Sequence, residues 1–211
     1  MKRRTLGRFI GASLGLALLA STPFVRAAEE APDALIKRVS DEVLGAIKSD
    51  RDIQAGDLRK VLALVDSQVM PHVNFTRMTA SVVGRSWRQT TPDQKQRLQQ
   101  EFKTLLIRTY SGALSQVDDQ RLNVKRLRAA PTDNEVVVRT EVIGRGSPAQ
   151  LDYRMEKTPT GWKIYDLNVL GIWMVETYRT QFSQEINAKG IDGLIAALAR
   201  RNLSNAGNAK S

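Results

Sequence analysis

One histidine and the absence of cysteine limit the catalytic chemistry that this sequence offers. His72 is the only histidine among the 211 residues, and no cysteine is present to act as a nucleophile. A Ser-His-Asp triad would have to use His72, which follows Pro71, and no Gly-X-Ser-X-Gly motif accompanies it after residue 27. One histidine among scattered carboxylates is also a poor zinc site. We therefore expect His72 to cap a helix end or lie on the surface, with no metal site and no catalytic residue.

Other motifs do not point to a reaction or a cofactor. Gly144, Arg145 and Gly146 lack the remaining glycines and the helix start of a phosphate-binding loop. Catalysis by two carboxylates stays open, because the two groups need not be close in the chain. A hydrolase of lipid or cell wall, with His72 as its best catalytic candidate, is thus one alternative. We expect instead a protein that is not an enzyme and uses no cofactor.

Apolar and aromatic side chains are the remaining material for a site. They recur on faces of expected helices and strands that converge on one another, which indicates an apolar cavity that can hold a ligand. Ordinary core is the alternative at each position, and it would suit an assembly or chaperone factor without a cavity. The candidate lipid-binding residues are Val69, Phe75, Met78, Val82, Phe102, Leu106, Tyr110, Val138, Leu151, Tyr153, Met155, Ile164, Ile172, Val175, Tyr178 and Phe182.

Basic residues outnumber acidic ones and suggest an anionic partner. The net charge is +10, and removing the five basic residues of the first 27 lowers it to about +5. Outside the cytoplasm, phospholipid head groups and acidic protein surfaces are commoner anionic partners than nucleic acid. A solvated basic surface and docking on acidic faces of membrane complexes are the alternatives. The candidate head-group residues, which would meet a lipid phosphate at the cavity mouth, are Arg77, Arg85, Arg88 and Arg179.

The first 27 residues have the features of a signal peptide. A basic start precedes the apolar run Phe9–Ala20, and Val25 and Ala27 stand where a signal peptidase reads small residues. The apolar run has about 12 residues, whereas a bilayer-spanning helix needs roughly 20, so a membrane anchor is the weaker interpretation. Arg3 and Arg4 leave a twin-arginine export route open. We expect cleavage after Ala27 and a location in the periplasm of a Gram-negative bacterium.

The remaining chain has the length of one domain. We expect a monomeric lipid-binding domain over residues 28–203 and a polar, flexible tail over residues 204–211. No cysteine is available for a disulfide, so packing alone must stabilise this domain.

Hydrophobic periodicity places helices on both sides of a group of strands. Residues 149–156 show the cleanest alternation of apolar and polar side chains, and short turns separate the strands, which is typical of an antiparallel meander. The sequence therefore predicts an α+β fold, with N-terminal helices, a four-stranded antiparallel sheet and C-terminal helices that enclose an apolar lipid cavity. The expected helices cover 34–49, 57–70, 74–83, 91–117, 172–188 and 191–202, and the expected strands cover 122–127, 135–143, 149–156 and 162–169.

Two blocks of the sequence resemble the MlaC family of periplasmic phospholipid-binding proteins, also called the toluene-tolerance auxiliary family. The first block runs from Val73 to Arg88, continues as Thr91-Pro-Asp-Gln-Lys and ends with Phe102 to Tyr110. The second block comprises Gly161 to Ile172 and Tyr178 to Phe182. The resemblance covers about residues 34–198, which is nearly the whole mature chain.

This resemblance implies a phospholipid carrier. Such proteins exchange lipid with an outer-membrane lipoprotein complex and with an inner-membrane transporter complex that has an MCE-domain subunit and an ATPase, which maintains outer-membrane lipid asymmetry. The carrier itself is not an ATPase. One residue departs from the family pattern, because Trp173 stands where a small residue such as serine is common. We expect Trp173 to narrow the cavity, to shield its mouth or to alter ligand preference.

Overall fold

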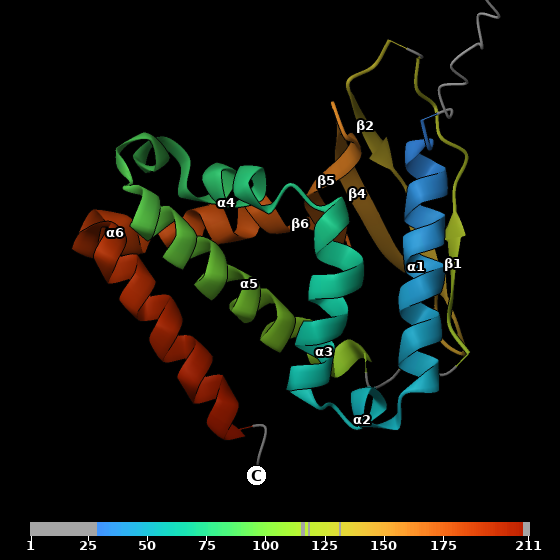
Figure 1. Cartoon of the computed structure of the whole chain (residues 1–211), viewed down its shortest axis with the longest axis horizontal. Coiled ribbons are helices and arrows are strands. Elements are labelled where there is room, and N and C mark those ends of the chain that lie inside the picture. Colours follow the sequence, from blue (N-terminus) through green and yellow to red (C-terminus); the bar gives the residue numbers. More distant parts are fainter. Residues whose placement is uncertain (1–28, 115–116, 118, 131, 209–211) are drawn as a thin grey trace, which may run out of the picture.

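The computed structural model describes residues 29–208 except 115, 116, 118 and 131. The predicted signal peptide lies outside the described residues. The predicted α+β class is confirmed, because helices precede and follow an antiparallel sheet (Figure 1). The helices are α1 (Pro32–Ser49), α2 (Arg51–Gln54), α3 (Leu58–Leu64), α4 (Phe75–Val83), α5 (Pro92–Leu114) and α6 (Met174–Asn208), with short segments η1 (Val65–Val69), η2 (Met70–His72) and η3 (Gly84–Gln89).

Polar caps fix the starts of the helices where the sequence indicated them. The side chain of Asn74 accepts a hydrogen bond from the backbone N–H of Arg77 at 3.0 Å and so caps α4. At the start of α5, the Thr91 N–H donates to the Gln94 side chain at 3.1 Å, and the Gln94 N–H donates to the Thr91 hydroxyl at 3.3 Å. This reciprocal pair is the predicted capping box. Helix α5 is described from Pro92 to Leu114, and Val117, the expected end, is not helical.

The expected helix over residues 57–70 is interrupted. Helix α3 ends at Leu64, and the chain continues as a π-helical turn, η1, and a 3-10 turn, η2. Two local causes are visible. Pro71 has no N–H to continue the helical ladder, and the Ser67 hydroxyl donates to the backbone carbonyls of Ala63 and Leu64 at 2.8 and 3.2 Å.

Within the described residues the sheet has six strands, where the sequence predicted four. The expected strand over 135–143 is divided at Arg139, because the Thr140 N–H donates to the carboxylate of Asp152 at 3.0 Å instead of to the neighbouring backbone. A short strand also replaces the expected start of the helix at residue 172. The strands are β1 (Arg121–Val124), β2 (Glu135–Val138), β3 (Thr140–Ile143), β4 (Ala149–Thr158), β5 (Gly161–Val169) and β6 (Ile172–Trp173).

A β-bulge in β5 separates an apolar face of the sheet from a polar one. Met155 of β4 lies opposite Ile164, and Arg154 lies opposite Asp166, so Tyr165 is one residue extra. Without this extra residue, Ile164 and Asp166 would point to the same side. With it, Ile164 joins the apolar side chains of β4, while Asp166 points to the opposite face.

Helix α6 is bent and longer than expected. Gly190 has φ 69° and ψ −172°, which breaks the helix into two segments that meet at an angle in Figure 1. This matches the predicted interruption at Gly190. The helix then continues to Asn208, so the expected tail from residue 204 begins as helix.

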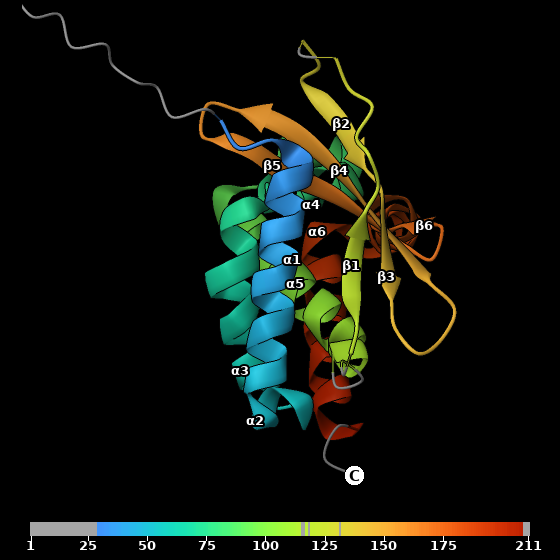
Figure 2. The same ribbon diagram turned by 90° about the vertical axis from the view of Figure 1, so that its right-hand side faces the viewer.

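Buried apolar side chains form three clusters. Figures 1 and 2 show α1 lying along the sheet, with α4, α5 and α6 packed together at the other side of the molecule. The helical cluster consists of Phe75, Met78, Val82, Val83, Leu98, Phe102, Leu105, Met174, Tyr178, Phe182, Leu194, Ile195 and Leu198. The sheet cluster, between α1 and the sheet, consists of Leu35, Ile36, Val39, Val136, Val138, Tyr153, Met155 and Ile164. A smaller cluster of Ile47, Ile53, Val61, Leu64 and Ile107 joins α1, α2, α3 and α5.

Candidate lipid-binding site

The structure divides most of the candidate lipid-binding residues between two apolar walls. The wall from α4, α5 and α6 belongs to the helical cluster, and the wall from β2, β4 and β5 belongs to the sheet cluster. Candidates within or packed against the helical cluster are Phe75, Met78, Val82, Phe102, Leu106, Val175, Tyr178 and Phe182. Candidates within or packed against the sheet cluster are Val138, Leu151, Tyr153, Met155 and Ile164.

Three aromatic rings pack around Phe102 in the helical wall. The Phe102 ring is 5.1 Å from the Tyr178 ring and 5.2 Å from the Phe182 ring, both in edge-to-face geometry, and 5.6 Å from the Phe75 ring. Phe102 is fully buried. These side chains pack against one another as core residues do, and their contact with a lipid stays a prediction.

The two walls meet at Val73 and Leu167, which pack against both clusters. The backbone strengthens this junction, because the Asn74 N–H donates to the Ile164 carbonyl at 2.8 Å. Leu106 on the helical wall and Leu151 on the sheet wall are only partly buried. Partly buried positions at the edges of the walls are therefore better placed for a ligand than the fully buried ones.

The remaining candidates, Val69, Tyr110 and Ile172, lie outside the buried clusters. Val69 is half-buried in η1. The Tyr110 side chain is 37% exposed, and its hydroxyl donates to the Met174 sulfur at 3.0 Å. Ile172 is 58% exposed, although it pairs with Val169, which packs on the helical cluster. Ile172 thus lies at the surface beside the helical cluster, and its contact with a lipid stays a prediction.

Trp173 lies on the polar face of the sheet. It pairs with Asn168 of β5, and the Arg154 guanidinium lies 3.9 Å from the centre of its ring. Arg154 in turn donates to the carboxylate of Asp166 at 2.9 Å. The expectation that Trp173 narrows an apolar cavity is thus not supported, because its ring packs on a cation of the opposite face.

Asp166 joins this polar face to the start of α6. Its side chain is 1% exposed, and one carboxylate oxygen accepts the backbone N–H groups of Leu167 at 2.9 Å and Val175 at 3.0 Å. Burial raises the pKa of Asp166, while the hydrogen bonds from Val175, Leu167 and Arg154 oppose that rise. Sequence reasoning missed this role of Asp166, because the role depends on the bulge at Tyr165.

The candidate head-group arginines have different surroundings. Arg77 is held by carboxylates: it lies 2.6 Å from Glu135 and 2.5 Å from Glu156, and its guanidinium stacks 3.6 Å from the centre of the Tyr165 ring. With its donors bound, Arg77 is better assigned to holding α4 on the sheet than to binding a phosphate. Arg88 is exposed in η3.

Arg85 and Arg179 are brought together at a small surface hollow. This hollow has a volume of about 270 Å³ and lies between the end of α4 and the first half of α6. Gly84 leaves room for the guanidinium of Arg179, whose Nε and Nη2 lie 3.8 Å from the position a Cβ would take. The hollow is lined by Val83, Gly84, Arg85, Ser86, Arg179, Ser183, Ile186 and Asn187, and none of these is acidic.

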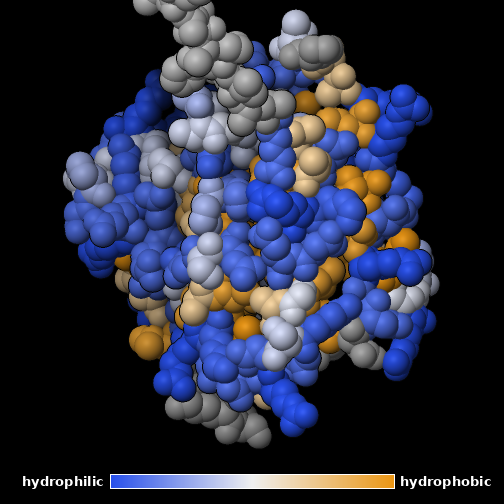
Figure 3. Space-filling model, turned by 45° about the vertical axis from the view of Figure 1, so that its right-hand side comes forward, coloured by the Kyte–Doolittle hydropathy of each residue, from blue (hydrophilic) through white to orange (hydrophobic). Residues whose placement is uncertain are grey.

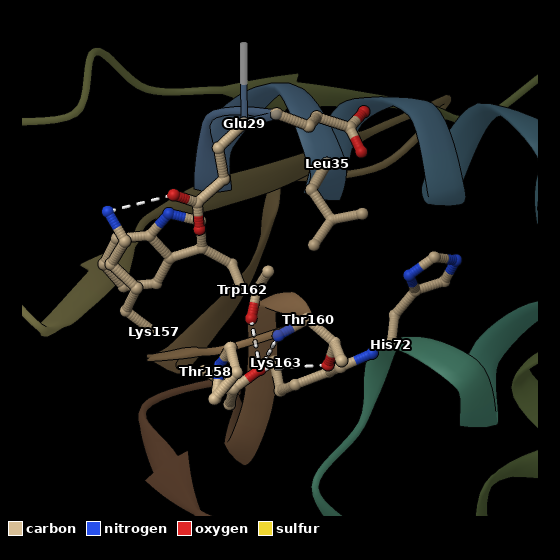
Figure 4. Close-up of a pocket in the computed structure, with 11 residues that line it drawn as sticks. Glu29, Leu35, His72, Lys157, Thr158, Thr160, Trp162 and Lys163 are labelled. Atoms are coloured by element: carbon tan, nitrogen blue, oxygen red, sulfur yellow. Dashed lines mark hydrogen bonds and ion pairs between the residues drawn. The ribbon is translucent and has the colours of Figure 1, made fainter. Parts of the chain in front are cut away.

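A larger hollow of about 710 Å³ was not expected from the sequence. It lies between the start of α1, His72 and the turn that joins β4 to β5 (Figure 4). Lys157 contacts Glu29 at 2.9 Å, and Lys163 donates to the Pro71 carbonyl at 2.6 Å. Its walls are largely polar, so it does not suit acyl chains. Sequence reasoning missed it because segments far apart in the chain form it.

His72 faces this polar hollow without a catalytic arrangement. Burial, followed by the positive charges of Arg38 and Lys163, lowers the pKa of His72. Figure 4 shows its ring across the hollow from Leu35 of α1. Among the residues that the structure describes, no group of three or more histidine, cysteine or acidic side chains could hold a metal ion.

Apolar side chains also reach the surface. On the face turned forward in Figure 3, they remain visible in several places between hydrophilic side chains. In the described part of the chain, no helix is both long and apolar enough to cross a membrane.

The described fold belongs to the α+β class, with an apolar wall of helices and an apolar wall of antiparallel strands that meet at Val73 and Leu167. The family model described as MlaC protein matches residues 37–200, and the chain therefore belongs to the MlaC family. The resemblance seen in the sequence is thus confirmed.

Individual relatives agree with this assignment. The chain is 47% identical to the phospholipid-binding protein of Ralstonia solanacearum, whose structure was solved in complex with a phospholipid, with a TM-score of 0.80 over 82% of this chain and 98% of that one. It is 22% identical to the intermembrane phospholipid transport system binding protein MlaC of Haemophilus influenzae, over 81% of this chain and 82% of that protein. It is 25% identical to toluene tolerance protein ttg2D of Pseudomonas putida, over 84% and 83%.

Proposed function

We propose that this protein is a periplasmic phospholipid carrier and not an enzyme. The observation that carries the proposal is its likeness to the Ralstonia solanacearum protein in complex with a phospholipid, at 47% identity and a TM-score of 0.80. The expected signal peptide over residues 1–27 supports export. The domain over residues 28–203 would then be the lipid-binding part.

The physical task of such a carrier is to keep acyl chains out of water. At ~0.8 kcal/mol per CH₂, a tail of 16 carbons costs about 13 kcal/mol to expose. Free passage of a phospholipid through an aqueous compartment is therefore slow. A protein that covers the tails removes most of this cost, and dispersion contacts with the walls add to the binding.

We place the tails between the helical wall and the sheet wall. The walls share few junction residues, chiefly Val73 and Leu167, and are otherwise carried by separate elements. Leu106, Leu151 and Val175, which are partly buried at the edges of the walls, would contact the tails. Tyr110 would lie near the opening, because its ring is partly exposed while its hydroxyl reaches Met174.

The head group would remain near water, where arginines can meet its phosphate. Of the candidate arginines, Arg85 and Arg179 are the better placed, because they share a hollow without an acidic lining residue. We further propose that a monomer exchanges lipid with an outer-membrane lipoprotein complex and with an inner-membrane MCE-domain transporter complex. That pair of partners is implied by membership of the MlaC family.

Mass spectrometry tests the proposal directly. The mature protein is purified, its organic extract is analysed, and the native mass of the intact protein is measured in parallel. A carrier is expected to hold near-stoichiometric glycerophospholipid. The variant Tyr110→Glu should lose this lipid and remain folded, since the side chain is 37% exposed.

Leu203→Glu is the matched control, because Leu203 is 73% exposed near the end of α6 and belongs to neither wall. It should retain lipid as the unchanged protein does. A protein that is free of lipid, and that takes none from labelled vesicles, would overturn the proposal and favour an assembly or chaperone factor. Turnover of lipid or cell wall that is lost in His72→Ala would instead favour a hydrolase.

A further inference from the structure

The turn between β5 and β6 holds a leucine in a left-handed backbone conformation that is unfavourable for its side chain. Leu170 has φ 53° and Gly171 has φ 90°, and Val169 pairs with Ile172 across them. Positive φ at both central residues is the pattern of a type I′ turn, which favours Asn-Gly or Asp-Gly. Leu170 is the only described residue other than glycine with positive φ.

The same residue is also exposed. Leu170 is 66% exposed and Ile172 is 58% exposed. Among the described residues, the large exposed apolar side chains are these two together with Tyr110 and Leu203. Tyr110 belongs to the same corner of the molecule, because its hydroxyl reaches Met174, which directly follows β6. Apolar exposure is therefore concentrated around this hairpin.

Backbone strain and apolar exposure at one position both oppose stability, and neither is compensated by a contact of the Leu170 side chain within the core clusters. The turn does not need leucine for its own hydrogen bonds. The Leu170 N–H donates to the Gln150 carbonyl at 3.0 Å, and the Gly171 N–H donates to the Asn168 side chain at 2.9 Å. A leucine that is unfavourable both for the backbone of the turn and for its contact with water indicates that its side chain contacts another molecule.

The chemistry around the tip suits a bilayer interface. Two aliphatic side chains project at the turn, Trp173 follows at once, and the Arg154 guanidinium lies on its ring. Interfacial membrane contacts have this arrangement. Aliphatic side chains enter the acyl-chain region of the bilayer, and tryptophan and arginine lie behind them among the head groups. The net charge of the mature chain, about +5 after removal of residues 1–27, complements anionic phospholipid.

We propose that the β5–β6 hairpin, with Leu170 at its tip, is a contact surface for the interface of a phospholipid bilayer. The contact is shallow and reversible, because it rests on two aliphatic side chains and not on a long apolar helix. It goes beyond lipid carriage, since it concerns how the protein meets a membrane surface and not how it encloses a lipid.

Flotation of the mature protein with vesicles tests this contact. The vesicles contain equal parts of zwitterionic and anionic phospholipid and no protein. Leu170→Asn removes the aliphatic side chain and gives the turn its preferred Asn-Gly pair, so it should keep or raise the thermal unfolding midpoint. The partition coefficient of this variant onto the vesicles is expected to be about three- to tenfold lower than that of the unchanged protein.

Leu203→Asn makes the same replacement at an exposed leucine away from the hairpin and should leave vesicle binding unchanged. Leu170→Gly, which also tolerates positive φ, checks that the effect follows from the lost side chain. Equal binding of the unchanged protein and both Leu170 variants would overturn the proposal. So would failure of the unchanged protein to bind vesicles, a result that would favour a protein partner for the hairpin.

Extracted lipid separates this proposal from lipid carriage. If Leu170→Asn carries the same lipid as the unchanged protein but no longer floats with vesicles, the bilayer contact is supported. If the variant floats normally, the contact proposal fails while carriage stands. If the unchanged protein holds no lipid yet floats through Leu170, carriage fails and the contact stands.

Discussion

The carboxylate of Asp166 accepts the backbone N–H of Val175 at 3.0 Å and so ties the last long strand to the first turn of α6. The same oxygen binds the Leu167 N–H, and the second oxygen binds Arg154. One buried side chain thereby holds in place the helix that supplies Val175, Tyr178 and Phe182 to the helical wall. A negative group at a helix start is also favoured by the helix dipole.

Replacing Asp166 should loosen that attachment. In Asp166→Asn an NH₂ group, which cannot accept a hydrogen bond, replaces one of the two carboxylate oxygens. It then faces either Arg154 or the backbone N–H groups, so at least one hydrogen bond of the buried site is lost. We expect the free energy of unfolding to fall by about 1–3 kcal/mol, and amide exchange at Val175 to quicken. Asp41→Asn is the control, because Asp41 is 53% exposed in a surface pair with Lys37 and should change little. Equal effects in both variants would contradict the assignment.

The contact of Arg77 with Glu135 and Glu156 predicts a pH-dependent stability. The hydrogen bond from Arg77 holds the pKa of Glu135 below its ordinary 4.5. The folded protein therefore binds this proton less tightly than the unfolded chain, so the pair stabilises the fold above about pH 4.5 and stops doing so as the pH falls through the lowered pKa.

We therefore expect Arg77→Gln to lose about 1–3 kcal/mol at neutral pH, because Glu135 and the 17% exposed Glu156 both lose their cationic partner and Glu156 keeps only the hydrogen bond from the Asn74 amide. Urea denaturation at several pH values should show this difference shrinking on acidification. Arg59→Gln, at a side chain that is 93% exposed, should show little difference at any pH. A loss that is constant with pH would contradict the carboxylate pairing.

Phe102 is expected to be the most sensitive position of the helical wall. Phe102→Ala leaves a cavity between three aromatic rings and should lower the free energy of unfolding by about 3–5 kcal/mol, whereas Phe102→Leu keeps part of the volume and should cost less. Equilibrium denaturation measures both. A loss below about 1 kcal/mol for the alanine variant would mean that the ring cluster does not stabilise the wall.

Two glycines should respond to alanine with opposite signs. Gly190 has φ 69° and ψ −172°, a region that only glycine occupies readily, so Gly190→Ala is expected to destabilise the bend in α6 by about 1–3 kcal/mol. Gly45 lies in α1 with open space around its missing Cβ. Gly45→Ala should stabilise the protein by about 0.5–1 kcal/mol. Thermal unfolding of both variants checks the pair, and the same sign for both would contradict this account.

Trp173 should matter for stability more than for cargo. Its ring packs on Arg154 at 3.9 Å on the polar face. We expect Trp173→Ser to lower the free energy of unfolding by about 0.5–1 kcal/mol and to leave the extracted lipid unchanged in amount and chain length. A shift toward longer or additional chains would show that the ring restricts the lipid site after all.

Local patterns predicted the elements that local forces determine. The alternation over residues 149–156 foretold β4 because one face of that strand is buried, and the Thr91–Gln94 capping box foretold the start of α5. The division of the strand at Arg139 was missed, since it depends on Asp152 reaching the Thr140 N–H from another strand. Strand β6 was missed because it pairs only with β5 and is two residues long.

Hydrophobic periodicity identified the apolar faces that form the walls of the site, but it did not separate fully buried positions from partly buried ones. Val82 and Leu106 both fit an apolar helix face, yet Val82 is completely buried and Leu106 is only partly so. Which of them a ligand can reach depends on the neighbouring helices, and these are not encoded in the local pattern. Arg77 shows the same limit for charge, because its carboxylate partners come from β2 and β4.

The extra residue Tyr165 also restricts how the β4–β5 hairpin can assemble. A strand with strict alternation can shift by two residues along its neighbour and still present the same face. In β5, by contrast, pairing that omits the bulge would place Asp166 on the same face as Ile164, near Val136 and Met155. A hairpin paired in this way would carry a buried carboxylate without its Arg154 partner, which costs free energy. The bulge therefore favours one pairing of β4 with β5, in a chain that has no cysteine to fix this pairing by a disulfide.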